Sequence, residues 1–183
     1  MNITISLETP QDIPQVQQVI ADAFGSHEEA ALVNQLRQDP GWLPALSLVA
    51  KDRHGAVIGH VVCTRASVGA HPAVTLAPLS VHPAHQGSGV GSALMLTCIE
   101  AARAAGEKII TVLGHPQYYP RFGFMPAAGC GVTCRLNNGP DDAKMVMSLD
   151  GAPIPPGEMG FCRPMTEAIQ AYQPAADNPP ATN

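Results

Sequence analysis

Residues 79–94 are the most informative stretch of this chain and read Leu-Ser-Val-His-Pro-Ala-His-Gln-Gly-Ser-Gly-Val-Gly-Ser-Ala-Leu. It overlaps the end of an apolar run rich in β-forming residues, Val74 to Val81, and leads into an Ala-rich segment of helical periodicity. Between the two lie Gly87, Gly89 and Gly91, where the absence of a Cβ lets a ligand approach the backbone. The free N–H groups of the first helical turn then point at that ligand. A strand, a glycine turn and a helix in this order predict a site for a phosphate or pyrophosphate.

Two common phosphate motifs do not fit these glycines. The phosphate loop of ATPases requires a lysine directly after its last glycine, and here Ser92 follows Gly91. The dinucleotide fingerprint requires the spacing G-x-G-x-x-G and an acidic residue about 20 residues further on. The spacing here is G-x-G-x-G, and Glu107, near that distance, begins the next predicted strand rather than ending it. An ordinary nucleotide-binding protein is therefore a poor interpretation, since no carboxylate suited to Mg²⁺ follows the loop either.

A second block of residues narrows the choice. It follows a short apolar strand, Ile109 to Leu113, and reads Tyr-Tyr-Pro-Arg-Phe-Gly-Phe over residues 118–124. In it, Tyr119 stands four residues before the glycine of a Gly-Phe pair. This pattern, together with Q-x-x-G-x-G beginning at Gln86, resembles the GNAT (Gcn5-related) N-acetyltransferases, and most of all their YhbS-like bacterial branch.

The resemblance covers roughly residues 3–150 and implies the GNAT fold. That fold is an α/β (α+β) architecture, a mixed central sheet of about six or seven strands with helices on both faces, splayed at its two parallel central strands. We expect the splay between the strands over Leu76–Val81 and Ile109–Leu113, which a helical crossover makes parallel. A single domain is expected over residues 1–165. Residues 173–183 contain three prolines and no large apolar residue, which predicts a disordered tail.

Local signals place the other elements. Thr9-Pro10 predicts an N-cap and the first position of a helix. Ser26-His27-Glu28-Glu29 is typical of a capping box that opens a second helix. Towards the C-terminus we expect two antiparallel strands, Gly131 to Leu136 and Lys144 to Leu149, followed by a Pro/Gly-rich segment over residues 151–164 that wraps the surface.

The resemblance implies acetyl-CoA as cosubstrate and no metal. The residues assigned to its binding belong to the glycine turn, the strand before it and the loop after the next strand: Leu79, Ser80, Val81, Gln86, Gly87, Ser88, Gly89, Val90, Gly91, Ser92, His115 and Tyr118. We expect the pantetheine arm to pair with the backbone of Leu79 and Val81 as an added strand would. The Val81 amide is then the candidate donor to the thioester oxygen.

Tyr119 is the candidate general acid for the CoA thiolate, because the pKa of a phenol, near 10, is close to that of a thiol. The alternative is a packed aromatic residue with a satisfied hydroxyl. The general base is open, since the strand before the glycine loop carries no Glu. Glu28, at the start of the second helix, and His82, just past the strand, are the two candidates for a catalytic base. A water chain is a third possibility.

Composition sets further limits. The 183 residues carry a formal net charge of −5 with no cluster of Lys and Arg, which argues against nucleic acid as a partner. No apolar run reaches the ~20 residues of a membrane span, and the N-terminal residues do not have the pattern of a signal peptide. Five irregularly spaced cysteines favour free thiols, a reducing compartment and no zinc site. We therefore expect a cytoplasmic protein, as a monomer or a homodimer.

These observations predict an N-acetyltransferase that moves an acetyl group from acetyl-CoA to a primary amine of a small molecule or peptide, by direct transfer in a ternary complex. The alternative is a catalytically weak acyl-CoA-binding sensor or regulatory module, which the missing carboxylate base keeps open. Tyr119 argues against it, because a pure binding module needs no acid there. The sequence does not identify the acceptor amine.

Overall fold

The computed structural model describes residues 2–136 and 139–172. Its strands are β1 (Thr4–Leu7), β2 (Trp42–Lys51), β3 (Val57–Val68), β4 (His71–Leu76), β5 (Ser80–Val81), β6 (Ile109–Leu113), β7 (Met125–Pro126), β8 (Val132–Thr133), β9 (Lys144–Ser148) and β10 (Gly157–Phe161). Its helices are α1 (Ile13–Phe24), α2 (Glu28–Leu36), α3 (Val90–Ala104) and α4 (Arg163–Ala171). Four 3-10 turns connect them: η1 (Pro83–His85), η2 (Tyr119–Phe122), η3 (Ala127–Cys130) and η4 (Asp141–Ala143).

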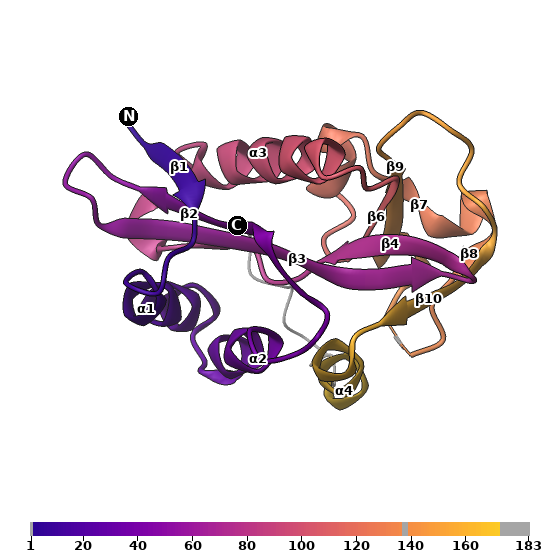
Figure 1. Cartoon of the computed structure of the whole chain (residues 1–183), viewed down its shortest axis with the longest axis horizontal. Coiled ribbons are helices and arrows are strands. Elements are labelled where there is room, and N and C mark those ends of the chain that lie inside the picture. Colours follow the sequence, from indigo (N-terminus) through magenta and orange to yellow (C-terminus); the bar gives the residue numbers. More distant parts are fainter. Residues whose placement is uncertain (1, 137–138, 173–183) are drawn as a thin grey trace.

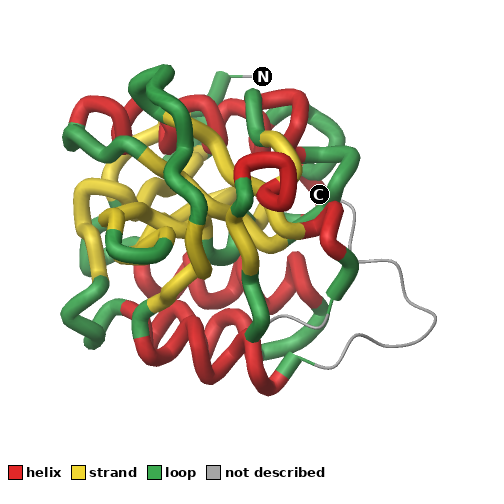
Figure 2. Tube along the Cα trace, turned by 90° about the vertical axis from the view of Figure 1, so that its right-hand side faces the viewer, coloured by secondary structure: helices red, strands yellow, loops and turns green. Residues whose placement is uncertain are grey.

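The strands form one mixed sheet whose main path is β1-β2-β3-β4-β6-β9-β7. Helix α3 covers one face of the sheet, and α1, α2 and α4 lie on the other (Figure 1). Figure 2, seen from the side, shows the strands as a layer with helices above and below it. The predicted α/β architecture with helices on both faces is confirmed. The described residues form ten strands rather than six or seven, because the sheet includes three strands of only two residues, β5, β7 and β8.

The predicted splay lies between β4/β5 and β6. Strands β4 and β6 run parallel and share two residue pairs, the last of which is Thr75–Thr111. Thr75 Oγ1 donates a hydrogen bond to the carbonyl of Thr111 at 3.3 Å, at the point where the two strands part. Beyond it β5 pairs with β3 instead, with Val81 opposite Gly59. A gap therefore opens between β5 and the C-terminal half of β6.

The expectation of one continuous strand from Val74 to Val81 is wrong. The strand breaks over residues 77–79 into β4 and β5. Pro78 has no amide hydrogen to donate to a neighbouring strand, so the ladder cannot continue through it. The amide of Ala77 already turns away from β6 and donates to the carbonyl of Val62 in β3 at 2.8 Å.

The C-terminal third of the sheet pairs differently from the expectation. Strand β9 is antiparallel to both β6 and β7, so the predicted hairpin between residues 131–136 and 144–149 is wrong. Within residues 131–136, β8 forms instead and pairs in parallel with β10. Strand β10 in turn extends the far end of β3, so residues 151–164 do more than wrap the surface. These partners lie far apart in the sequence, and a local pattern does not encode them.

The first and last helices also differ from the expectation. Helix α1 begins at Ile13, because the carboxylate of Asp12 accepts hydrogen bonds from the amide and hydroxyl of Thr9 at 3.0 and 2.8 Å and closes a turn there. Helix α4 was not anticipated, and the predicted domain limit at residue 165 falls inside it. The predicted tail, residues 173–183, lies outside the described residues. The capping-box side chains do meet, since Ser26 Oγ donates to Glu29 at 2.6 Å.

A charged network is enclosed between the sheet and α2. Glu8 accepts hydrogen bonds from Arg37 Nε and Ser47 Oγ, each at 2.7 Å. Nε2 of the fully buried His60 lies 2.9 Å from the same carboxylate. Burial acts to raise the pKa of Glu8, but the hydrogen bonds from His60, Arg37 and Ser47 outweigh it and bring the pKa to about 2. Burial also lowers the pKa of His60, so a carboxylate and a neutral imidazole share this site.

Candidate active site

The glycine turn joins β5 to α3 through backbone that only glycine adopts with ease. Gly87 and Gly89 have φ of +70° and +90°. A Cβ at either position would meet no atom within 4 Å, so both glycines border open space. Gly89 is the N-cap of α3, and the amides of the first helical turn therefore have no helical acceptor. The turn thus presents backbone donors to an anion.

A cavity of about 260 Å³ lies at this turn. It is lined by Val81, His85, Gln86, Gly87, Gly89, Gly91, Ser92, Tyr118 and Arg121. Nδ1 of His85 is buried and has no hydrogen-bond partner among the described residues, and the guanidinium of Arg121 supplies positive charge. Helix amides, an unpaired imidazole nitrogen and a guanidinium together fit a pyrophosphate group.

The cavity accounts for seven of the twelve residues predicted to bind cofactor, from Val81 to Tyr118. The other five do not line it: Leu79, Ser80, Ser88, Val90 and His115. Leu79 and Val90 have their side chains in the apolar core under α3, and Ser80 Oγ lies 3.5 Å from the carbonyl of His60. His85 and Arg121 were not assigned from the sequence. An isolated His or Arg in a loop carries no spacing signal, so only the fold shows that they meet the glycine turn.

The backbone of Val81 faces the gap in the sheet. The amide of His82 donates to the carbonyl of Ile58 in β3 at 2.9 Å. Successive amides of a strand point to opposite edges, so the Val81 amide points away from β3, toward the gap between β5 and β6. Gln86 Nε2 donates to the Val81 carbonyl at 3.1 Å and fixes the end of β5.

Tyr119 stands in η2, beside the end of β6. Its ring lies against Gly114, where an added Cβ would overlap the ring. Edge-on contacts hold the ring from two further sides, with centroid distances of 5.2 Å to Tyr118 and 5.7 Å to Phe124. Burial, followed by the nearby Tyr118 and Cys63, raises the pKa of the Tyr119 phenol well above its usual value of 10. The hydroxyl stays protonated at neutral pH, as an ordinary phenol does, but the raised pKa makes Tyr119 a weaker acid than the match to a thiol pKa assumed from the sequence.

Comparisons with known proteins place this geometry in a family. Residues 44–126 match the model of the acetyltransferase (GNAT) domain, which spans both the glycine turn and Tyr119. The N-acetyltransferase YjhQ of Escherichia coli (strain K12) is 42% identical over 132 residues, which are 70% of this chain and 72% of YjhQ. The chain belongs to the GNAT N-acetyltransferases.

Other relatives resemble this GNAT enzyme in sequence and in fold. The E. coli N-acetyltransferase YhbS is 36% identical over 133 residues, 72% of this chain and 78% of YhbS. The crystal structure of E. coli YhbS in complex with CoA superposes with a TM-score of 0.78 at 31% identity, over 87% of this chain and 89% of that one. A GNAT acetyltransferase from Brucella melitensis in complex with acetyl-CoA gives a TM-score of 0.75 at 28% identity, over 90% and 98%. The predicted resemblance is confirmed, and the GNAT enzyme is an acyltransferase.

The two candidate bases of the GNAT enzyme lie in different settings. Nδ1 of His82 accepts a hydrogen bond from the amide of Ala84 at 3.2 Å, and its Nε2 lies 3.7 Å from a carboxylate oxygen of Asp22. The Nδ1 lone pair of His82 is therefore engaged by the backbone of the loop. Glu28 is exposed at the start of α2, and its carboxylate has no partner within the described part of the chain.

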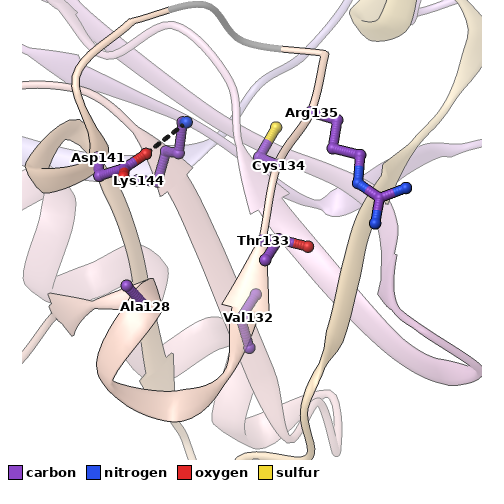
Figure 3. Close-up of a pocket in the computed structure, with 7 residues that line it drawn as sticks. All are labelled: Ala128, Val132, Thr133, Cys134, Arg135, Asp141 and Lys144. Carbon is purple, nitrogen blue, oxygen red and sulfur yellow. Dashed lines mark hydrogen bonds and ion pairs between the residues drawn. The ribbon is translucent and has the colours of Figure 1, made fainter.

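A second cavity, of about 400 Å³, lies beside β8 and β9 of the GNAT enzyme (Figure 3). It is lined by Ala128, Val132, Thr133, Cys134, Arg135, Asp141 and Lys144. Lys144 and Asp141 form an ion pair at 2.8 Å, and Figure 3 shows Arg135 pointing away from that pair. This cavity includes neither a glycine turn nor a long helix N-terminus, so the smaller cavity is the better anion site.

Two further observations concern metals and membranes. Within residues 2–136 and 139–172, no group of three or more His, Cys, Asp and Glu side chains is arranged to hold a metal ion. No helix in the same part of the GNAT enzyme combines the length and the apolar character that crossing a membrane requires.

Proposed function

We propose that this GNAT enzyme transfers an acetyl group from acetyl-CoA to a primary amine, by direct transfer in a ternary complex. The observation that carries the proposal is the contact between the anion cavity and the proton donor. Tyr118 lines the cavity, and its ring meets Tyr119 at 5.2 Å. The CoA and acetyl-CoA found in the YhbS and Brucella structures support the choice of cosubstrate.

The chain's own groups divide the work of binding. The amides at the start of α3, with Arg121 and His85, hold the pyrophosphate. The backbone of β5 pairs with the pantetheine arm, and the Val81 amide donates to the thioester oxygen, where negative charge develops. Acetyl-CoA supplies the acetyl group as a thioester, and its departure leaves a thiolate that must gain a proton. Holding both substrates in the one gap supplies much of the acceleration.

Tyr119 provides that proton from its hydroxyl. A phenol is protonated across the physiological pH range, so the donor is present there. The proton of the amine leaves through Glu28 or through water. We assign His82 to shaping the loop rather than to the role of base, and its hydrogen bond from the Ala84 amide supports this assignment.

A thiol-release screen of acetyl-CoA against a library of amines tests the proposal. Release of CoA that depends on an amine supports acetyl transfer and identifies the acceptor class. Tight binding of acetyl-CoA without release for every class of amine would overturn it in favour of the sensor.

The cofactor site is tested separately by calorimetry with Gly89→Asp, which puts a carboxylate where the phosphates are expected. Gly55→Asp is the matched control, because Gly55 also has a positive φ, +83°, and no atom within 4 Å of an added Cβ. The two variants carry the same backbone strain and the same charge. Loss of acetyl-CoA binding in Gly89→Asp alone is the expected result, and equal affinity in both variants would contradict the assignment.

A further inference from the structure

The third glycine of the turn differs from the other two. Gly87 and Gly89 have positive φ, whereas Gly91 lies in the first turn of α3 outside the left-handed region. The backbone at Gly91 therefore suits any residue. A Cβ there would lie 3.0 Å from the hydroxyl oxygen of Tyr118, which is closer than ordinary van der Waals contact. The missing side chain leaves room for a tyrosine of this chain.

Tyr118 makes contact with three functional parts of the site. Its phenol is hydrogen-bonded by the side chain of Ser92, in the first turn of α3. The guanidinium of Arg121 lies over its ring at 4.4 Å from the centroid, and Arg121 Nε donates to the Tyr118 carbonyl at 3.2 Å. The edge-on contact with Tyr119 comes from the other side. One side chain thus touches the cofactor helix, the cation of the cavity and the proposed acid.

We propose that Tyr118 is a positioning residue that docks the η2 turn onto α3, and that position 91 is a glycine because of this docking. The Tyr118 hydroxyl sets how close η2 comes to α3. The turn then carries Arg121 over the anion cavity and Tyr119 to the end of β6. The roles of Arg121 and Tyr119 rest on the proposed function, whereas the docking contact does not.

The proposal predicts that the effect of Gly91→Ala on the melting temperature changes sign when Tyr118 is replaced by Phe. Alanine forms helix better than glycine, so Gly91→Ala stabilises α3 wherever nothing opposes the new methyl group. In the wild-type protein the Tyr118 oxygen opposes it, and that side chain has little freedom to move between Arg121, Tyr119 and Ser92. In Tyr118→Phe the oxygen is gone while the ring and its stacking contacts remain.

The experiment compares wild type, Gly91→Ala, Tyr118→Phe and the double variant by melting temperature and by calorimetric titration with acetyl-CoA. Gly91→Ala alone should lower the Tm and weaken acetyl-CoA binding about tenfold, a coupling of ordinary size for residues in contact. The same change made in Tyr118→Phe should raise the Tm and leave the affinity at that of Tyr118→Phe. Ser92→Ala, which removes the hydrogen bond to Tyr118 and a hydroxyl of the cavity lining but adds no methyl group near Tyr118, should weaken binding less. Tyr172→Phe, at an exposed tyrosine of the C-terminal end, is the control.

Equal loss of affinity from Gly91→Ala in both backgrounds would overturn the proposal, since it would mean that the ligand requires the glycine. A higher Tm for Gly91→Ala in the wild-type background would overturn it as well. Both readouts are independent of turnover, so they decide the docking even if no amine accepts an acetyl group. Where an acceptor is found, Gly91→Ala should raise the KM for acetyl-CoA and lower kcat together, and Tyr118→Phe should relieve both effects of the added methyl group.

Discussion

Glu8 and Tyr119 are two buried acids on opposite faces of the sheet. One is ionised and the other is neutral. Glu8, on the α2 face, has a pKa lowered to about 2 and is ionised. Tyr119, on the α3 face, has a pKa raised above its usual value and is neutral. Burial acts against ionisation in both cases. The two pKa shifts run in opposite directions because three hydrogen-bond donors surround Glu8, whereas aromatic rings surround Tyr119.

The two groups have different roles. Glu8 is a charged group that stabilises the fold, whereas Tyr119 is a neutral group that we propose as a proton donor. The carboxylate of Glu8 is closed off from solvent and binds together β1, α2, β2 and β3. The ring of Tyr119 lies among aromatic neighbours, and its hydroxyl keeps its proton. The roles of Glu8 and Tyr119 can each be tested by substituting the acid itself or a residue that contacts it.

The largest expected effect comes from Glu8→Gln. The substitution leaves the Arg37 guanidinium, 12% exposed, beside a neutral amide. Removing one partner of a buried ion pair costs about 3 kcal/mol of unfolding free energy. Urea unfolding measures this loss, and acetyl-CoA affinity at 25 °C should remain that of wild type. The control is Glu100→Gln, whose pair with Arg103 is exposed and should contribute less than about 0.5 kcal/mol. An equal loss in both variants would mean that the buried network adds nothing beyond a surface pair.

Tyr119→Phe removes one hydroxyl and keeps the ring in its packing. If Tyr119 protonates the thiolate, kcat should fall by roughly 10²-fold while acetyl-CoA affinity and Tm stay the same. Steady-state kinetics with any accepted amine measure the change, and Tyr172→Phe should behave as wild type. Because the pKa of Tyr119 is raised, the wild-type kcat should show no descending limb from this group below about pH 10. An unchanged kcat in Tyr119→Phe would make the residue a packing element only.

The third effect is a loss of stability in mild acid. The folded-state pKa of His60 lies below its unfolded value of 6.5, so the unfolded chain binds more protons between the two. The contribution is complete above pH 6.5 and is lost as pH falls toward the folded pKa. Its slope is at most about 1.4 kcal/mol per pH unit. Glu8 adds a second loss below pH 4.5, from its unfolded pKa of 4.5 to about 2.

Urea unfolding at pH 7.5, 6.5 and 5.5 separates these steps. In His60→Gln the part of the slope that begins at pH 6.5 should be reduced, whereas His71→Gln, at an exposed histidine, should retain it. The same slope in both variants would remove His60 as its source.

The smallest effect is that of Thr75→Val, which deletes a neutral hydrogen bond at the origin of the splay. The Thr111 carbonyl loses the donor at 3.3 Å, at a cost of about 1 kcal/mol. Thr75→Ser keeps the hydroxyl and separates that loss from the loss of a methyl group. The free energy of unfolding measured in urea should be highest for wild type, lower for the serine variant and lowest for the valine variant. A serine variant less stable than the valine variant would mean that the methyl group contributes more than the hydrogen bond.

The sequence drew attention to the glycine turn and to Tyr119 because their signals are local. Gly87 and Gly89 need a positive φ, and Tyr119 stands at a fixed spacing from a Gly-Phe pair, so each is visible within a few residues. Sequence reasoning did not separate Gly91 from the other two glycines, because Tyr118, whose hydroxyl lies beside it, is distant in the chain. It also missed the break at Pro78 and the pairing of β8 with β10. Those features depend on which strands meet, and a repeating apolar pattern does not specify the partner.

One end of the long strand β3 has an unpaired edge while the chain is being synthesised. Trp42 of β2 pairs with Thr64, and beyond that point residues 66–68 take residues 159–161 as their partners along the same edge. On the ribosome this part of β3 is made well before its partner. An unpaired strand edge is a template for pairing with another chain. Nascent chains and chains cleaved before β10 are therefore the forms most prone to associate. Once β10 is present, it covers that edge of β3.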